Sequence, residues 1–238
     1  MELTKISLSK VLFLDIETVS ASASYEDLSP RMQALWAKKA KQLSKHEEDT
    51  PEVLYEKAGI YAEFGKIVVI SVGFFRGEEL RITSFYGDDE KQLLADFAIL
   101  VNHHFNTAGH YLCAHNGKEF DFPYIARRML IQGISLPDML NTPGKKPWEV
   151  KHLDTLALWK FGDYKHYTSL DLLTAIFDIP TPKEDISGSD VGGIYWHEQD
   201  LDRIKRYCEK DVLALSRLYQ RYCNLPIVPD TKVQFVGT

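Results

Sequence analysis

Two acidic side chains interrupt an otherwise apolar segment near the start of the chain. Residues 11–16 read VLFLDI, which is typical of a strand buried on both faces, and Asp15 and Glu17 stand two residues apart at its end. On a strand this spacing places both side chains on one face, ~6.6 Å apart along the backbone. Two buried like charges so close need a cation, so the pair predicts a metal site. Pairing with a buried lysine or arginine is the alternative.

The same spacing occurs again at Asp88 and Glu90, and this second pair serves as an internal comparison. It follows Gly87 in an expected turn and opens an expected helix, so capping and the helix dipole account for it. The D-x-E spacing is therefore weak evidence by itself. What distinguishes Asp15 and Glu17 is their position at the end of a buried strand.

Two further acids stand where they could join the first pair. Asp121 follows an expected strand from Tyr111, close to a helix start, where an aspartate often only caps the helix. Asp211 comes four residues after Tyr207 on the last long helix, so both side chains project from one side. The apolar stripe of this helix consists of Ile204, Cys208, Leu215 and Leu218. Asp211 falls inside the stripe, and a buried unpaired carboxylate requires a cation, a basic partner or a proton.

Tyr167 and Asp171 repeat the spacing of Tyr207 and Asp211 and provide another comparison. On their helix the apolar stripe leaves Asp171 beside Asp178, toward the solvent side. This second tyrosine and aspartate pair therefore needs no functional explanation.

Four carboxylates emerge as candidate metal ligands, namely Asp15, Glu17, Asp121 and Asp211. Oxygen ligands without clustered histidine or cysteine suit Mg²⁺ or Mn²⁺ better than structural zinc. In two-metal phosphoryl transfer, two ions ~3.5 to 4 Å apart activate a water molecule and stabilise the leaving oxygen. Four carboxylates neutralise most of that charge, so the sequence predicts a site for two divalent cations.

The remaining pattern predicts alternating strands and helices that position these acids. Strands are expected from Val11, Ile67, Leu80 and Tyr111 and near Leu153, with a hairpin turn at Gly77. Helices are expected at about 89–104, through 125–132, from Asp154 or Thr155, from Thr168 or Ser169, and at about 200–222. Asp154 is expected to cap its helix and is left outside the metal set. The stretch between Pro180 and Gly193 is predicted to be a loop.

Residues from about 20 to 65 separate the first two strands and are too many for a turn. Pro30 after Ser29 and Pro51 after Thr50 are two helix starts, which predicts a two-helix insertion. Basic residues expected on one face of its first helix are Arg31, Lys38, Lys41 and Lys45. This face is predicted to contact the substrate backbone, although a solvated charged face is the simpler explanation.

Composition sets the limits for any such site. The chain has 238 residues, 45% of them hydrophobic, and 28 basic against 34 acidic residues give a net charge of −6. Binding to nucleic acid must therefore depend on a local basic surface. Three cysteines without C-x-x-C spacing argue against a disulfide framework or a zinc finger. Without an apolar run of ~18 residues or a signal-peptide core, a cytoplasmic protein with no membrane partner is expected.

The order of three motifs resembles a known superfamily. FLDIET, HNGKEFD and YCEKD are similar to the exonuclease motifs of the DEDD superfamily, in the branch with tyrosine in the third motif. The chain most resembles the proofreading exonuclease domain of family B DNA polymerases and the stand-alone predicted exonucleases related to it. The resemblance runs from about Val11 to Tyr222. It departs from the minimal fold in the two-helix insertion, and no polymerase domain follows.

This resemblance implies a ribonuclease-H-like fold, a mixed five-stranded sheet with its first three strands antiparallel and helices around it. One exonuclease domain would span 1–238, with the insertion at about 20–65 and a tail at about 224–238. Carried over by position, Asp15, Glu17 and Asp211 would hold one metal, and Asp15 with Asp121 the other. Tyr207 would position the attacking water. Thr18 and Asn116 match positions that lie beside the terminal nucleotide in relatives, and Phe120 is a further candidate for substrate binding.

The resulting expectation is a metal-dependent 3′ to 5′ exonuclease that removes nucleoside 5′-monophosphates from single-stranded DNA. RNA is the alternative substrate. A nucleic-acid-binding or polymerase-docking module without activity is the rival from another class, and a separate polymerase or repair protein would be its partner. The acidic set disfavours a pure binder, because such a protein would gain affinity for phosphates by losing those charges.

Overall fold

The computed structural model describes residues 5–163, 167–180 and 186–237, and a mixed sheet lies at their centre. Six strands follow the order β5-β4-β1-β2-β3-β6. They are β1 (Val11–Ser20), β2 (Gly65–Arg76), β3 (Glu79–Tyr86), β4 (Tyr111–Ala114), β5 (His152–Asp154) and β6 (Val233–Phe235). The first three are antiparallel neighbours, whereas β4, β5 and β6 run parallel to the strands they join. All five predicted strands and the α/β class are confirmed.

The sixth strand corrects the predicted five-stranded sheet. It comes from the C-terminal tail, where Val233 pairs with Leu80 of β3. The preceding helix ends at Tyr222, ahead of the prolines at 226 and 229, and the chain then turns through the short helix η6 (Asp230–Lys232) and reaches the edge of β3. Pairing there covers an edge strand that would otherwise expose unpaired backbone groups.

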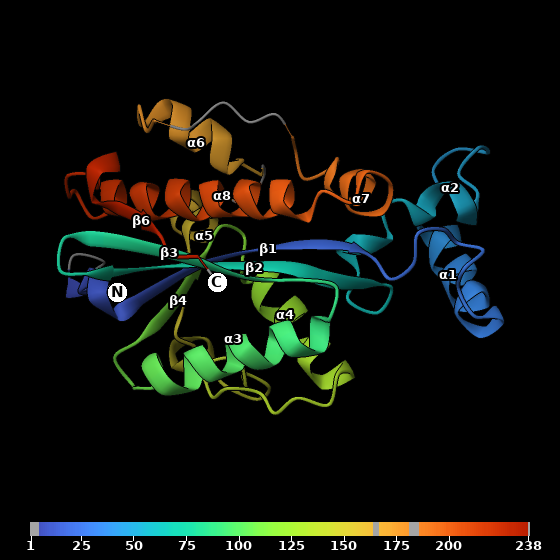
Figure 1. The fold of residues 1–238 in the computed structure, drawn as a ribbon, viewed down its shortest axis with the longest axis horizontal. Coiled ribbons are helices and arrows are strands. Elements are labelled where there is room, and N and C mark those ends of the chain that lie inside the picture. The colour runs from blue at the N-terminus through green and yellow to red at the C-terminus, as the bar shows by residue number, and fades with distance from the viewer. Residues whose placement is uncertain (1–4, 164–166, 181–185, 238) are drawn as a thin grey trace.

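Helices cover both faces of the sheet (Figure 1). They are α3 (Glu90–His104), α4 (Asp121–Ile131), α5 (Thr155–Lys160), α6 (Leu170–Ile176), α7 (Val191–Gly193) and α8 (Leu201–Tyr222), with short helices η2 (Leu8–Lys10), η4 (Pro147–Glu149) and the π-helix η5 (Ile194–Glu198). Helix α8 crosses one face, with α6 beyond it, and α3 and α4 lie on the other. The predicted helix starts are confirmed, including the Asp154 and Ser169 caps.

Strand β1 is buried on both faces and lies between two apolar clusters. Leu12, Leu14 and Ile16 belong to the cluster on the α3 and α4 side. Val11 and Phe13 point to the other side, toward α8. Because side chains alternate along a strand, Asp15 and Glu17 continue the α8 side. Both carboxylates therefore lie on the face of β1 that α8 covers, and they share one face as the D-x-E spacing predicts.

The insertion forms a separate small layer beyond the end of the sheet (Figure 1). It contains α1 (Pro30–Leu43), α2 (Pro51–Tyr55) and η3 (Ala58–Ile60), and Ser29 and Thr50 cap the first two as predicted. A buried cluster around Trp36, with Leu54 and Tyr55, holds these helices together. Helix α1 ends at Leu43, so Lys45 lies beyond it, and its predicted place on the helical face is wrong.

The comparison pair at 88 and 90 has a structural role, but a different one from that predicted. Asp89, not Asp88, caps α3. Glu90 is only 5% exposed and accepts hydrogen bonds from Arg128 and from the backbone of Ile67. A buried ion pair with a residue 38 positions away therefore explains Glu90, and the helix dipole is not needed.

Two further sequence predictions concern the surface of the fold. The predicted loop between Pro180 and Gly193 includes 181–185, which lie outside the described residues, and its end forms α7. Within the described ranges, none of the helices is both long and apolar enough to cross a membrane.

Candidate active site

A cleft of about 670 Å³ opens between α8, α6 and the loop from β4 to α4. Three of the four predicted acids and the predicted tyrosine line it, namely Asp15, Asp121, Asp211 and Tyr207. They come from β1, from the first position of α4 and from α8. The fold thus brings together residues that are almost 200 positions apart in the chain.

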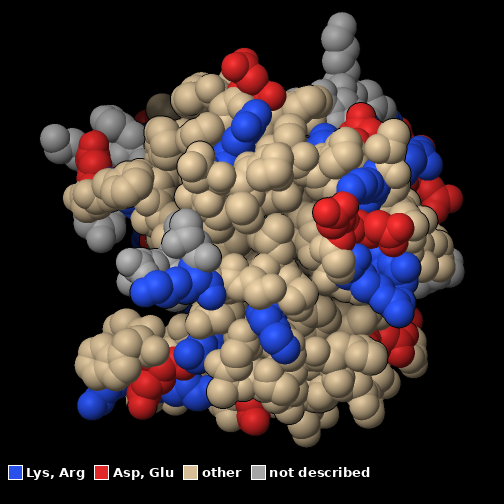
Figure 2. All heavy atoms as spheres, turned by 90° about the vertical axis from the view of Figure 1, so that its left-hand side faces the viewer, with Lys and Arg blue, Asp and Glu red and all other residues tan. Residues whose placement is uncertain are grey.

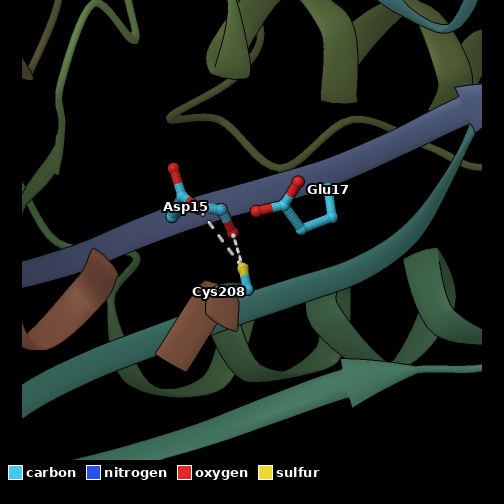
Figure 3. Close-up of side chains that lie close together, drawn as sticks. All are labelled: Asp15, Glu17 and Cys208. Carbon is cyan, nitrogen blue, oxygen red and sulfur yellow. Dashed lines mark hydrogen bonds between the residues drawn. The ribbon is translucent and has the colours of Figure 1, made fainter. Parts of the chain in front are cut away.

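Asp15 lies at the centre of the acidic cluster. Its pKa is raised well above the usual value, first by burial and then by the negative charges of Asp211, Glu17 and Asp121. Glu17 is only 7% exposed, lies two residues further along β1 and is not among the described residues that line the cleft. Carboxylate oxygens of both residues and the Cys208 sulfur lie within 4.8 Å of one another (Figure 3). Such a cluster of buried acids is stabilised by a bound cation.

Asp121 is the most deeply buried of the acids that line the cleft. It is 2% exposed, and its Oδ1 atom has no hydrogen-bond partner. Burial raises its pKa to about 7, with Asp154 and Asp211 acting in the same direction and the Asp121 and Ile16 amides opposing them. An orphaned buried carboxylate oxygen facing other acids fits a divalent cation bound by oxygen.

Asp211 and Tyr207 lie one turn apart on α8 and face the same cleft, as their spacing predicts. The four apolar residues of the predicted stripe include Cys208 and are buried. Asp211 itself is only partly buried, which corrects the prediction of full burial. It borders the opening between α8 and α6, so the stripe is interrupted where the cleft begins.

Asp154 organises the loop that forms one wall of the cleft. Its carboxylate accepts hydrogen bonds from the amides of Asn116 and Lys118, and from those of Leu156 and Ala157 at the start of α5. Asn116 has φ of 63°, a conformation that asparagine tolerates better than most residues. The prediction that Asp154 is a cap is confirmed, and the same side chain also holds the loop.

The structure separates the candidate substrate-binding residues into two groups. Asn116 and Phe120 line the cleft. Thr18 is absent from the described lining and lies after a register shift between Glu17 and Thr18, where its side chain is a hydrogen-bonding neighbour of Tyr124, whose pKa burial raises. Lys38, Lys41 and Lys45 are exposed in the insertion, away from the lining of the cleft.

Several residues of the cleft were not predicted from the sequence. They are His115, Tyr167, Ser169, Leu170, Asp171, Thr174 and Ala214. Asp171 is exposed, as predicted, yet it stands in the cleft wall. Tyr167 precedes the start of α6, so it does not share a helix with Asp171, and the comparison with the pair on α8 fails. Because a loop positions Tyr167, the spacing of residues along a helix could not predict that this side chain lies in the cleft.

His115 links the loop between β4 and α4 to the opposite wall of the cleft. Its Nε2 donates to the Thr168 carbonyl at 2.9 Å, so in the neutral ring Nδ1 accepts from the Thr155 hydroxyl, also at 2.9 Å. Burial lowers the pKa of His115, which favours this neutral form. The histidine therefore connects the start of α5 to the segment before α6 without adding positive charge to the acidic cleft.

Comparison with solved structures shows the class of fold. The chain is similar to the family B DNA polymerase from the hyperthermophilic archaeon Pyrobaculum calidifontis, with a TM-score of 0.53 and 18% identity. The similarity covers 90% of this chain and 27% of the polymerase, so the chain spans about a quarter of that protein. The sheet with its flanking helices is thus a ribonuclease-H-like fold similar to a polymerase exonuclease domain.

The family is shown by the sequence. Residues 60–228 match the family described as "predicted 3′-5′ exonuclease related to the exonuclease domain of PolB", and the chain belongs to this family. The matched segment contains Asp121, Tyr207 and Asp211. Asp15 and Glu17 precede it, so their assignment depends on the geometry of the cleft.

Proposed function

We propose that this protein is a metal-dependent 3′ to 5′ exonuclease that hydrolyses single-stranded DNA from its 3′ end and releases nucleoside 5′-monophosphates. The observation that supports this most strongly is the cluster around Asp15. Three other carboxylates raise the pKa of Asp15, and Asp121 has a buried oxygen without a partner. Membership of a predicted 3′-5′ exonuclease family supports the same reaction.

The donor set suits two hard divalent cations, Mg²⁺ or Mn²⁺. Asp15, Glu17 and Asp211 would hold one ion, and Asp15 with Asp121 would hold the other. When bound, these cations would supply charge neutralisation and Lewis-acid stabilisation of the reacting phosphate. The protein's own contribution is to hold the carboxylates on β1, α4 and α8 in a fixed, largely buried arrangement.

The size of the cleft supports a single-stranded end as substrate. Its volume of about 670 Å³ lies within the range of small-molecule pockets, about 300 to 1,000 Å³. An unpaired nucleotide fits a space of this class, whereas a duplex end would first have to separate. Asn116 and Phe120 would contact the terminal nucleotide, and Phe120 offers an aromatic ring on which a base can stack.

DNA and RNA can be distinguished directly, because RNA differs at the 2′-hydroxyl. Oligonucleotides of the same sequence, as DNA and as RNA, would be incubated with the protein in Mg²⁺, in Mn²⁺ and in EDTA. We expect DNA to be degraded faster, and only with a metal. Faster degradation of RNA would make the protein an exoribonuclease, and binding without degradation of either would favour the docking module.

Replacing Tyr207 with phenylalanine is expected to lower kcat by about 10²-fold with little change in KM. The hydroxyl would orient the attacking water, which matters mainly in the transition state. Steady-state kinetics on a labelled DNA oligonucleotide measure both constants. Tyr222→Phe is the matched control, since Tyr222 lies on the same helix but packs against Trp159 and Phe177 outside the lining of the cleft, so kcat and KM should not change. Unchanged turnover in Tyr207→Phe would make this tyrosine a packing residue.

The insertion is proposed to contact the substrate backbone beyond the cleft. Helix α1 contains Arg31, Lys38, Lys39 and Lys41 and no acidic residue. The opposite end of the molecule is different. There Lys and Arg side chains alternate with Asp and Glu over a mostly uncharged surface (Figure 2), and Lys232 pairs with Glu78. Within α1 no acid interrupts this positive charge, although Glu47, Glu48 and Asp49 follow the helix closely. A helix of this kind attracts phosphates.

Neutralising Lys38, Lys41 and Lys45 to glutamine is expected to weaken DNA binding for all sequences. The slope of log K against log salt should become shallower by up to about 2, since each phosphate contact with a single strand contributes about 0.7. Fluorescence anisotropy in Ca²⁺, which suppresses cleavage, measures this slope. The control is a second triple variant with the same change in charge, in which glutamine replaces Lys91, Lys145 and Lys232. Equal slopes in the two triple variants would return α1 to a solvated charged face.

A further inference from the structure

A buried cysteine contacts the central carboxylate of the cluster. Cys208 is fully buried on α8, and its Sγ atom donates toward Asp15, 3.4 Å from both the backbone oxygen and Oδ2 (Figure 3). The contact lies on the sheet side of α8. It joins the helix that carries Tyr207 and Asp211 directly to the strand that carries Asp15.

This contact is the first in a chain of polar groups between α8 and the sheet. Ser71 is paired with Asp15 across β1 and β2, and it is also a hydrogen-bonding neighbour of the Cys208 thiol. The Ser71 and Ser84 hydroxyls lie 2.8 Å apart, and Ser84 donates to Glu209 Oε1 at 2.9 Å. Polar groups are rare under a packed helix, because each needs a partner there.

This series of polar groups ends at Glu209, which also meets Lys205 of the same helix. Glu209 is 5% exposed and pairs with Lys205, one turn earlier, at 3.1 Å. Cys208 and Glu209 are consecutive, so these polar contacts hold one turn of α8 at a defined rotation against β1, β2 and β3. Tyr207 immediately precedes this turn and Asp211 closely follows it. A rotation of α8 would move both away from Asp15.

We propose that Cys208 is a positioning residue for the metal site, holding the Asp15 carboxylate through its thiol and fixing α8 so that Asp211 faces the same cations. The inference rests on the proposed function. A sulfur ligand is poorly suited to Mg²⁺, so the thiol acts through Asp15. Partners that orient metal-binding carboxylates in this way typically contribute 10- to 100-fold to metal affinity.

Mn²⁺ titration calorimetry of the full chain tests this role. Cys208→Ala removes the donor and is expected to weaken Mn²⁺ binding about 10-fold or more. Cys208→Ser restores a donor and should recover most of the affinity. Cys113→Ala is the matched control, since Cys113 is equally buried but lies in the apolar core next to β1. On DNA, Cys208→Ala should lower kcat and leave KM unchanged.

Circular dichroism and thermal melting establish that each variant is folded. If Cys208→Ala does not fold, Cys208→Val replaces it, because valine keeps the volume and lacks the donor. Wild-type Mn²⁺ affinity in a folded variant without the donor would overturn the role of Cys208 and leave the proposed function intact. A wild-type protein that binds no Mn²⁺ would instead overturn the proposed function.

In that second case, the infrared S–H stretch of Cys208 still tests the contact with Asp15. The band is assigned by its loss in the donor-free variant. Asp15→Asn should shift it, because the amide of asparagine differs from the acid group of Asp15 as a hydrogen-bond acceptor. An unshifted band would show that the thiol does not hold Asp15.

Discussion

The Asp15→Asn protein is expected to remain folded and to hydrolyse DNA at least about 10³-fold more slowly than the wild type, since metal ions supply several kcal/mol of transition-state stabilisation. Asp15 is shared by both proposed metal positions and lies at the centre of the acidic cluster. Asparagine has almost the same shape, so the cleft is preserved while the charge is lost. Rates on a labelled oligonucleotide and circular dichroism of the same preparation measure the two effects.

Two comparisons make this result specific. Asp211→Asn should behave like Asp15→Asn, because Asp211 contributes the largest charge interaction with Asp15. Asp171→Asn is the control, since Asp171 lines the same cleft but is exposed and stands on α6. If Asp15→Asn degraded DNA at the wild-type rate, the assigned centre would be wrong.

The second large effect is on the stability of the metal-free protein. The pKa of Asp121 rises from 3.8 to about 7 on folding, so the folded state holds this proton more tightly than the unfolded state. The resulting stability is complete below about pH 4 and is lost as the pH rises through 7. At pH 8 this shift in the pKa of Asp121 lowers the free energy of unfolding by about 4 kcal/mol relative to acidic pH. Burial raises the pKa of Asp15 as well, with the same sign.

Asp121→Asn should therefore stabilise the metal-free protein strongly at pH 8 and only weakly at pH 4, where Asp121 is protonated in the folded state and about half protonated in the unfolded state. Thermal melting in EDTA at both pH values measures the difference, at about 2 to 4 °C per kcal/mol for a chain of this size. The same variant should be inactive. An Asp121→Asn protein less stable than the wild type at pH 8 in EDTA would contradict the view that a cation stabilises this cluster.

Local periodicity explains which parts of the site could be predicted from the sequence. Asp15 and Glu17 share a face because strands alternate, and Tyr207 and Asp211 share a cleft because they lie one helical turn apart. Asp121 could be placed only by the order of the three motifs. The shared face of each of these pairs depends only on residues within one strand or one helix, so it can be predicted without knowledge of tertiary contacts.

Contacts between distant segments explain what the sequence could not show. The partner of Glu90 is Arg128, and the strand at Val233 pairs with Leu80. Nothing in the local pattern specifies either pairing. Cys208 was assigned to the apolar stripe of its helix, correctly by burial, yet its sulfur faces Asp15. Which buried thiol meets a carboxylate depends on how α8 packs on β1.

The most direct test of the account is the direction and metal dependence of DNA degradation. A single-stranded oligonucleotide labelled at its 5′ end would be incubated with the wild-type protein and with Asp15→Asn, in Mg²⁺ or Mn²⁺ and in EDTA. The account predicts a ladder that shortens stepwise from the 3′ end, with nucleoside 5′-monophosphates as products, only for the wild type and only with metal. Intact oligonucleotide in every lane, or early loss of the labelled 5′ end, would contradict it.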